Sequence, residues 1–511
     1  MTGETIRAPA GGCGGSEPYD RAILNRTATH HAQRRWRILR VIAVLAVATL
    51  GVARPASSQA ASVPGPAVFT TGLVDDPAFQ SPSSSVRSVW LARAQQLGST
   101  SVRIGIAWNT VAPFDLPSGF NAANPRDPHY QWASLDATIR SATAGAQTVI
   151  LLVNRAPNWA EGPDRPSYVL QGAWDPSPQA FAAFAHALAL RYSGHFPDPL
   201  HHGRMLPEVS YFQAWNEPNL PSYLMPQWVQ GVNGSIVAES PVLYRALLNA
   251  FYTAIKHVQA HAFVLAAGTA PYGDPPGVGR MAPIVFLDGL FCLTPALRAE
   301  ACADPPHLDA LDHHPYGLAP TINARLPDDV AVPDLGKIWR VLHAAERTHH
   351  VLPAGPKSLW ITEIDWSTSP PAPLTQAVQA EYLSEGFYEL WSQDVSHVYW
   401  FQLRDPPGKT NSFAGAGLYF GNGVPKLSVA AFRFPFVALP VPRNKKSVIL
   451  WGKAPVAGTV VIQKRVGNGW RTVRTLRTTA GGIFYAVPRL SPLLQLRARI
   501  GAFASLPWVN G

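Results

Sequence analysis

Eight short apolar runs rich in β-branched residues alternate with longer amphipathic stretches between residues 66 and 436. This alternation predicts parallel strands joined by helices, because a strand that returns parallel to its neighbour needs a long crossover connection. Eight such units match a (β/α)8 barrel with long loops, an α/β fold. The expected strands span residues 67–74, 101–108, 148–154, 209–217, 263–269, 308–314, 358–365 and 397–403.

The segments between these strands show apolar residues at helical spacing. Five helices are expected, at residues 86–98, 181–194, 243–259, 338–350 and 378–393. An open, doubly wound sheet is the alternative. Such a sheet usually carries a Gly-rich phosphate turn after its first strand, whereas here the first strand runs into Leu-Val-Asp-Asp-Pro-Ala-Phe at 73–79. The pattern therefore favours the barrel over residues 62–436.

From residue 437 the pattern changes to short alternating strands that are separated by Gly and Pro turns. This change predicts a small C-terminal β-sandwich domain over residues 437–511. The segment holds 12 Lys and Arg but no Asp or Glu, whereas residues 66–436 carry a net charge of −7. The acidic middle argues against a nucleic-acid partner. The basic tail is expected to adhere to an anionic surface such as a cell-wall polymer.

The first 61 residues have the features of an export signal peptide. Four arginines at 34–40 precede an apolar run at 41–53 that is too short to span a bilayer comfortably. The small residues at 56–61 then offer a cleavage point. We therefore expect a secreted protein. An uncleaved membrane anchor is the alternative, and a membrane is a partner only in that case.

The number and positions of the cysteines are consistent with an exported protein. Cys13 falls in the leader, which leaves Cys292 and Cys302 in one loop-like segment. In an oxidising compartment this pair predicts one disulfide, and two free thiols are the alternative. No cofactor and no metal site is expected, since the adjacent histidine pairs at 201–202, 313–314 and 349–350 would point to opposite strand faces.

Polar residues stand at the ends of two predicted strands, where barrel enzymes place their chemistry. The fourth strand ends in Trp-Asn-Glu-Pro-Asn at 215–219, and the seventh ends in Thr-Glu at 362–363. A carboxylate at the tip of a buried strand is costly unless function requires it. Strands four and seven face each other across a barrel mouth, so Glu217 and Glu363 can form the carboxyl pair that glycosidic cleavage needs. Asp365, on the same strand face, is the rival to Glu363.

This combination resembles clan A glycoside hydrolases, close to families 39 and 5, over the whole barrel. Asn-Glu-Pro at the end of the fourth strand is the most specific element. The resemblance implies that Glu217 is the general acid/base, that Glu363 is the nucleophile, and that Asn216 binds the sugar 2-OH.

Further positions match the same clan. His-Pro-Tyr at 314–316 resembles its His-x-Tyr, which implies that Tyr316 contacts the nucleophile; His313 competes with His314 for this place. Arg103 resembles the arginine that keeps the nucleophile ionised, although it can instead pair with any acid of the barrel. Trp400 resembles the aromatic floor beneath the sugar, and a core position is the alternative for it. Three more tryptophans are candidates for sugar contact, with a core position as the alternative: Trp159, Trp108 and Trp366.

The sequence therefore predicts a secreted retaining glycoside hydrolase that acts on a carbohydrate by double displacement. The β linkage of the substrate is implied by the resemblance. A wall-associated carbohydrate-binding protein with a catalytically idle barrel and a transglycosidase are the alternatives. The insertions at 113–132 and 155–178 either enclose a pocket for exo action or border a cleft for endo action.

Overall fold

A computed structural model describes residues 64–370, 373–406, 414–479 and 481–509. The predicted leader over residues 1–61, including Cys13, lies outside the described residues. The described residues belong to one compact unit that begins at Pro64. Across these described ranges, no helix is long and apolar enough to cross a membrane.

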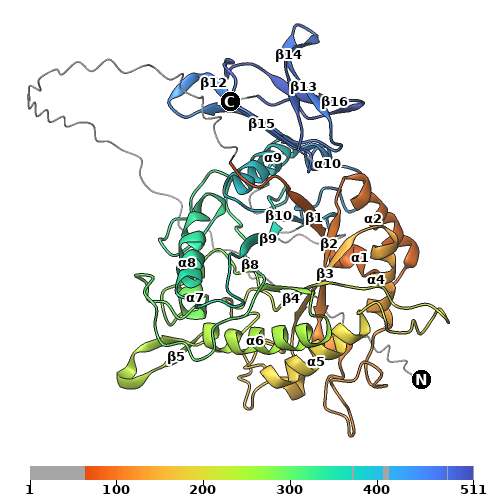
Figure 1. Cartoon of the computed structure of the whole chain (residues 1–511), viewed down its shortest axis with the longest axis vertical. Coiled ribbons are helices and arrows are strands. Elements are labelled where there is room, and N and C mark those ends of the chain that lie inside the picture. Colours follow the sequence, from red (N-terminus) through yellow and green to blue (C-terminus); the bar gives the residue numbers. More distant parts are fainter. Residues whose placement is uncertain (1–63, 371–372, 407–413, 480, 510–511) are drawn as a thin grey trace, which may run out of the picture. The chain divides into compact units, whose positions relative to one another are not determined.

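Eight parallel strands close into a barrel, which confirms the predicted fold class (Figure 1). Around the barrel the order is β1, β2, β3, β4, β7, β8, β9 and β10, and β10 pairs with β1. Each strand lies within a range predicted from the sequence. The strands are β1 (Thr70–Val74), β2 (Ser101–Ala107), β3 (Thr148–Asn154), β4 (Tyr211–Ala214), β7 (Phe263–Ala266), β8 (Ala310–Asp312), β9 (Ser358–Ile364) and β10 (His397–Phe401).

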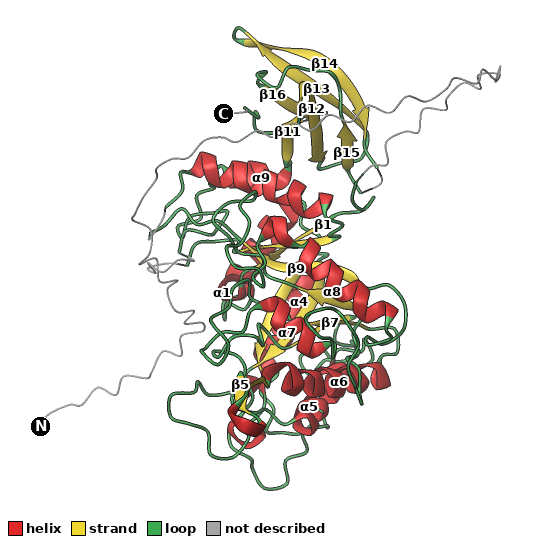
Figure 2. Ribbon diagram, turned by 90° about the vertical axis from the view of Figure 1, so that its left-hand side faces the viewer, coloured by secondary structure: helices red, strands yellow, loops and turns green. Residues whose placement is uncertain are grey.

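The strands are surrounded by helices (Figure 1 and Figure 2), which are α2 (Ser84–Gln96), α4 (Ala133–Ala144), α5 (Pro178–Arg191), α6 (Ser240–Val258), α7 (Pro283–Leu290), α8 (Gly336–Arg347), α9 (Gln376–Ser392) and α10 (Ser428–Arg433). The connecting loops contain α1 (Asp76–Phe79), α3 (Trp108–Val111), η1 (Asn158–Ala160), η2 (Val232–Gly234), η3 (Val332–Asp334), and a hairpin of β5 (Trp228–Gln230) and β6 (Ile236–Ala238). Helix α4 was not predicted, because its buried face includes Asp136 and Thr138 and this breaks the apolar periodicity.

The interior of the barrel has an apolar part and a polar part. Val74, Ile150, Leu265, Ala310, Trp360 and Tyr399 form an apolar cluster inside the ring of strands. Four further strand residues are buried and polar, and they bond to one another: Arg103, Gln213, Asp312 and Thr362. Burying this many polar groups is unfavourable unless they are hydrogen-bonded to one another. The polar part of the barrel interior is therefore a candidate site for function.

The C-terminal segment forms two antiparallel sheets, which confirms the predicted β-sandwich. One sheet contains β11 (Phe436–Val441), β12 (Asn444–Lys453) and β15 (Ile483–Ala486). The other contains β13 (Thr459–Val466), β14 (Gly469–Arg477), β16 (Leu496–Ile500) and β17 (Phe503–Ala504). Trp451 of this domain packs against Trp391 and Phe69 of the barrel, with ring centroids 5.7 and 6.0 Å apart. The two domains therefore share a hydrophobic core.

The loop after α7 is closed by a disulfide between Cys292 and Cys302, as predicted. Their Cα atoms lie 5.7 Å apart, and the backbone N–H of Glu300 donates to the carbonyl of Cys292 at 2.9 Å. The disulfide therefore fixes a local loop rather than joining distant elements.

Candidate active site

Glu217 lies in a tight turn just after β4. Trp215 and Glu217 have φ values of 72° and 36°, a region that residues other than glycine seldom adopt. Their backbone N–H groups donate to Val153 O and Gly268 O at 2.8 and 3.0 Å, which ties the turn to the ends of neighbouring strands. Such backbone outliers concentrate at functional sites. The turn places the Glu217 carboxyl beside His314 of the barrel interior.

Glu363 is positioned by a β-bulge. Ile361 of β9 pairs with Val398 of β10, but Trp400 pairs with Ile364, so β9 carries one extra residue. Ile361 and Ile364 are both buried in the core between barrel and helices. The two residues between them, Thr362 and Glu363, both bond to Arg103 of the barrel interior. The bulge thus turns two successive side chains inward, as bulges beside active sites often do.

The turn and the bulge bring the two carboxyl groups together. A carboxylate oxygen of Glu217 lies within 4.8 Å of one of Glu363, and each side chain is only 12% exposed. Retaining glycosidases hold their carboxyl groups about 5–5.5 Å apart, whereas inverting enzymes need about 6.5–9.5 Å. The separation therefore fits double displacement.

The carboxyl group of Glu363 is held by a cation and a phenol. Arg103 Nη2 forms an ion pair with Oε1, and Tyr316 Oη donates to Oε2 at 2.7 Å. Burial favours the neutral acid. The charges of Arg103 and His314 and the bond from Tyr316 outweigh burial and lower the pKa of Glu363. Glu363 is therefore ionised at neutral pH, as a nucleophile must be.

Glu217 has the opposite balance. Its Oε1 lies 3.0 Å from His314 Nδ1, but burial exceeds the effect of this bond, and the charge of Glu363 adds to it. The pKa of Glu217 is therefore raised. Two neighbouring carboxyl groups with pKa values shifted apart are the expected arrangement for a general acid beside a nucleophile.

His314 is surrounded by acids, and one of them, Asp312, was not predicted. Burial disfavours a charged imidazole, but the charge of Glu363 and the bonds to Asp312 and Glu217 raise the pKa of His314 to about 10. Asp312 Oδ2 lies 3.4 Å from His314 Nε2, and Oδ1 accepts from the backbone N–H of Thr362 at 2.9 Å. Asp312 and His314 are two residues apart in the strand predicted at 308–314, so alternation could have placed them on the same face.

The structure separates the rival candidates. His313 is fully buried, contacts Thr269 Oγ1 and Val330 O at 2.8 and 3.0 Å, and has its pKa lowered to about 3 by burial. It is a structural residue. Asp365 is 8% exposed, and burial followed by the charge of Glu363 raises its pKa well above the usual range. A carboxyl group kept protonated in this way is a poor nucleophile.

The structure contradicts the prediction that Trp400 lies beneath a bound sugar. Trp400 is completely buried between barrel and helices, and its Nε1 donates to Ala416 O at 2.9 Å. Strand alternation is the reason, because Tyr399 and Phe401 are the residues of β10 that pack inside the barrel. Phe401 is the last residue of the strand and is only partly buried. Its side chain, and not that of Trp400, therefore lies on the inner face at the carboxyl end of β10.

Trp108 and Trp366 take the core position that was the alternative for them. Trp108 begins α3, is completely buried and packs against Phe184 with ring centroids 5.5 Å apart. Trp366 is 4% exposed, and its Nε1 donates to Gly317 O at 3.1 Å. Both are core residues. Trp159 is half-buried, and its Nε1 donates to Pro113 O at 2.9 Å.

The long loops after β2, β3 and β4 are joined to one another. The backbone N–H of Asn158 donates to Phe114 O at 3.0 Å, so the two predicted insertions are in contact. Arg155 Nη1 donates to Ser222 O at 3.1 Å, which links the second insertion to the loop after β4. Since these loops follow neighbouring strands, they form one continuous wall at the carboxyl end of the barrel.

Two side chains on the β4 loop complete the site. Asn216 is 3% exposed, and its Oδ1 has no hydrogen-bond partner among the described residues. Tyr223 was not predicted. Burial, followed by the charges of Glu217 and Glu363, raises its pKa, so its hydroxyl lies within the field of both carboxyl groups. Buried polar atoms without partners are rare, and the free Asn216 oxygen is available to a ligand.

The same centre contains metal-ligating residue types. Glu217, His314 and Glu363 place one ligand-type atom each within 4.8 Å of the others. Arg103 and the protonated His314 already supply positive charge to these carboxyl groups. The donor set therefore suits proton transfer better than a bound cation.

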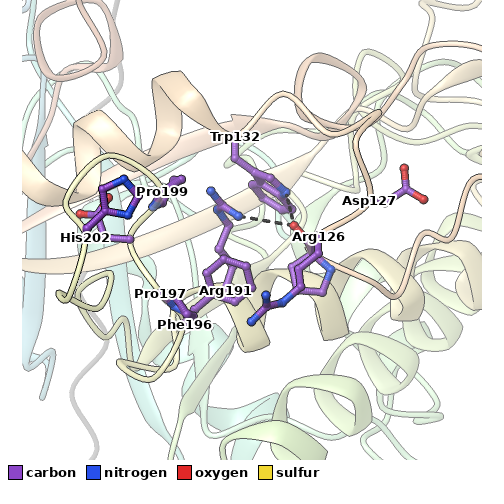
Figure 3. A pocket seen from close by; sticks show the side chains of 10 residues that line it. Arg126, Asp127, Trp132, Arg191, Phe196, Pro197, Pro199 and His202 are labelled. Carbon is purple, nitrogen blue, oxygen red and sulfur yellow. Dashed lines mark hydrogen bonds between the residues drawn. The ribbon is translucent and has the colours of Figure 1, made fainter.

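A separate cavity of about 440 Å³ lies in the outer layer of the molecule, and none of the residues above lines it (Figure 3). Trp132 Nε1 and Arg191 Nη1 both donate to Pro125 O there, at 3.1 and 3.4 Å. Arg191 is also bound through two nitrogens to Asp136, so the charged wall of this cavity is occupied by structural contacts.

The closed barrel and the facing glutamates define the class: a (β/α)8 protein with a carboxyl pair of the retaining type. No protein-family model and no curated protein matches the sequence. Among solved structures, a family 39 glycoside hydrolase from the gut symbiont Bacteroides cellulosilyticus WH2 aligns with a TM-score of 0.50 and 16% identity over 82% of this chain and 80% of that one. This confirms the predicted resemblance to family 39 at the level of the fold.

Two further structures show weaker similarity. A glucosidase from Croceicoccus marinus aligns with a TM-score of 0.47 and 13% identity, over 84% of this chain and 95% of that chain. A family 30 endoxylanase from Clostridium papyrosolvens C71 aligns with a TM-score of 0.44 and 12% identity, over 83% and 94% respectively. We therefore infer the roles of residues in this chain only from the geometry of its own site.

Proposed function

We propose that this chain is a retaining glycoside hydrolase. The observation that carries the proposal is the pair of carboxyl groups within 4.8 Å of each other, one with a raised pKa and one with a lowered pKa. Glu217 gives its proton to the leaving glycosidic oxygen while Glu363 attacks the anomeric carbon, so a glycosyl-enzyme ester forms and the aglycone leaves. Glu217 then takes a proton from water, which attacks the same carbon and releases Glu363.

The neighbouring residues support this sequence of steps. Arg103 and Tyr316 hold Glu363 as the anion. The free Oδ1 of Asn216 is suited to accept a hydrogen bond from the sugar 2-OH, an interaction that strengthens in the transition state. Phe401, at the end of β10, takes the place proposed earlier for Trp400 as the aromatic surface beneath the sugar.

The first test compares Glu217→Gln and Glu363→Gln with a control, Glu208→Gln. Glu208 precedes β4 at the opposite end of the barrel, where it accepts a bond from His261. We expect turnover of aryl β-glycosides to fall by about 10³-fold or more in the first two variants and to stay unchanged in the control. Full activity in either site variant would refute the proposal.

The two roles are separated by azide rescue. Azide should attack the sugar directly in Glu363→Gly and give a glycosyl azide of inverted configuration. In Glu217→Gly, azide should attack the glycosyl-enzyme and give the retained configuration. Rescue with the opposite stereochemistry would exchange the two assignments. Product analysis by NMR with an added sugar acceptor also shows whether water or a sugar is the preferred acceptor, which distinguishes a hydrolase from a transglycosidase.

We also propose a β-linked glycan as substrate and export as the location of the protein. The disulfide between Cys292 and Cys302 supports export, because such bonds persist in oxidising compartments. Sequencing the N-terminus of the protein recovered outside the cell tests this. A start near residue 61 is expected, and a protein retained in the reducing interior would refute it.

A further inference from the structure

One face of the C-terminal sandwich gathers positive charge. In β13, Val460 and Ile462 are buried in the sandwich core, so Arg465 points to the opposite side of the sheet. Strand pairing places Trp470 of β14 beside Arg465. On the other side of β13, pairing places Arg497 of β16 beside Gln463 and Arg499 beside Val461. We call the group Arg465, Trp470, Arg497 and Arg499 the arginine face.

The tryptophan holds two of the three guanidinium groups. The Arg497 and Arg465 guanidinium carbons lie 4.2 and 5.4 Å from the centroid of the Trp470 ring. The negative face of an indole attracts cations without neutralising them. The Nε–H group of each arginine also donates a hydrogen bond to a neutral acceptor. The acceptors are Gly467 O for Arg465, Gln463 Oε1 for Arg497 and Gly501 O for Arg499. The guanidinium groups are thus oriented while their charge remains.

Within the described ranges, these arginines have no carboxylate partner. Residues 437–511 contain no Asp or Glu, and none of the three arginines forms an ion pair in the part of the chain that the structure describes. Burial, followed by the positive charges of Arg499 and Arg465, lowers the pKa of Arg497. Like charges held this close repel each other, so the arrangement is more favourable with a bound anion than without one.

We propose that the arginine face binds an acidic polysaccharide, with the carboxylate or sulfate groups of one chain bridging the three guanidinium groups. The face lies along neighbouring strands, and the neutral side chains Gln463 and Thr472 between its charges can bond to sugar hydroxyls. Residues 66–436 carry a net charge of −7. This charge disfavours a broad polyanion such as duplex nucleic acid and leaves a narrow strip for a single glycan chain. The proposal does not depend on catalysis by the barrel.

The test uses the full chain, because the sandwich shares its core with the barrel through Trp451 and Trp391. Binding to polygalacturonate is compared with binding to the same polymer after methyl esterification, which removes the charge and keeps the backbone. The test variant is the triple change Arg465→Gln, Arg497→Gln and Arg499→Gln. The control variant removes the same charge from exposed arginines outside the face, by changing Arg471, Arg474 and Arg489 to Gln.

We expect wild type to bind the charged polymer in a salt-sensitive way and to bind the ester far less. The test variant should lose about tenfold or more in affinity, from three exposed ion pairs, and the control less than half as much on a logarithmic scale. Equal losses would show a general charge effect and overturn the proposal. Tighter binding to a DNA duplex or to anionic lipid vesicles of equal charge would also overturn it.

Two further measurements separate this proposal from folding and catalysis. Arg499 is exposed, so Arg499→Glu should weaken binding at an unchanged unfolding temperature. Trp470→Leu should also weaken binding, because it releases two guanidinium groups from the ring. Unchanged affinity in both variants would overturn the proposal. Turnover of a small aryl glycoside should stay at the wild-type value in the test variant, so a loss of binding here is independent of the outcome for Glu217 and Glu363.

Discussion

Arg103 gives the sharpest test of the electrostatics of the site. Its side chain is 4% exposed, it forms the ion pair with Glu363, and its charge also acts on Asp312 and Asp76. Arg103→Met keeps much of the volume but leaves the Glu363 charge uncompensated. Removing one partner of a buried pair costs about 3–5 kcal/mol. We expect the free energy of unfolding at neutral pH to fall by up to that amount, since protonation of Glu363 offers partial relief.

The pH dependence of this variant follows from the direction of the pKa shifts. In the wild type the folded pKa of Glu363 is below its unfolded value, so its contribution to stability is present above the unfolded pKa and is lost as the pH falls through the folded pKa. The stability difference between wild type and Arg103→Met should therefore be largest near neutral pH and narrow in acid. Without Arg103, burial dominates and the pKa of Glu363 rises. The acidic limb of kcat/KM should move up by about one pH unit or more, at about 1.4 kcal/mol per unit.

The matched control is Arg191→Met. Arg191 is 5% exposed and bonds through Nε at 2.8 Å to Asp136, in the helical layer. Urea unfolding and the pH profile of kcat/KM are measured for both variants. The control should lose similar stability and keep the wild-type acidic limb. An unmoved limb in Arg103→Met, or the same movement in both variants, would refute the assigned role of Arg103.

Three further predictions concern packing. Gly268→Ala should lower kcat/KM by about 10²-fold, because a Cβ there would lie 2.2 Å from His314 Nε2; wild-type kinetics would contradict the tight contact. Trp400→Phe should reduce the unfolding temperature without changing KM, whereas Phe401→Ala should raise KM, and the reverse pattern would restore Trp400 as the sugar platform. Cys302→Ser should lower the free energy of unfolding by about 3 kcal/mol, and reduced wild type should match it; no change in either would show that the disulfide does not stabilise the loop.

The strands could be predicted because each combines β-branched residues with a fixed place in a repeating unit. All eight observed strands fall within the predicted ranges. Helix α4 was missed because Asp136 stands on its buried face, where Arg191 and Tyr192 bond to it. When a buried polar residue has hydrogen-bond partners far away in the sequence, the apolar periodicity wrongly assigns it to the exposed face of the helix. Helix α7 was missed because its eight residues are too few to show a period.

The glutamates could be predicted because a carboxyl group at the end of a buried strand is chemically out of place. The aromatic residues could not be assigned in the same way. Tyr399, Trp400 and Phe401 are consecutive, so both faces of β10 are aromatic and alternation has two equally good phases. The sequence could have indicated Asp312, because it stands two residues before His314 in the predicted strand at 308–314. Its role in the site, however, depends on hydrogen bonds to residues of β4 and β9.

The bulge in β9 explains why the sequence could indicate Glu363 but not the direction of its side chain. With strict alternation Glu363 would point, like Ile361, into the apolar core between barrel and helices. The extra residue in β9 turns the Glu363 side chain toward Arg103 instead. On the other side of the barrel mouth, the turn with positive φ values at Trp215 and Glu217 likewise directs the Glu217 side chain into the site. Neither the bulge nor the turn can be recognised from a sequence pattern. Both are nevertheless needed, because burying a charged carboxylate without a partner is unfavourable. A buried acid in a predicted barrel is therefore best paired first with the available Arg and His residues, and its strand phase inferred from that pairing.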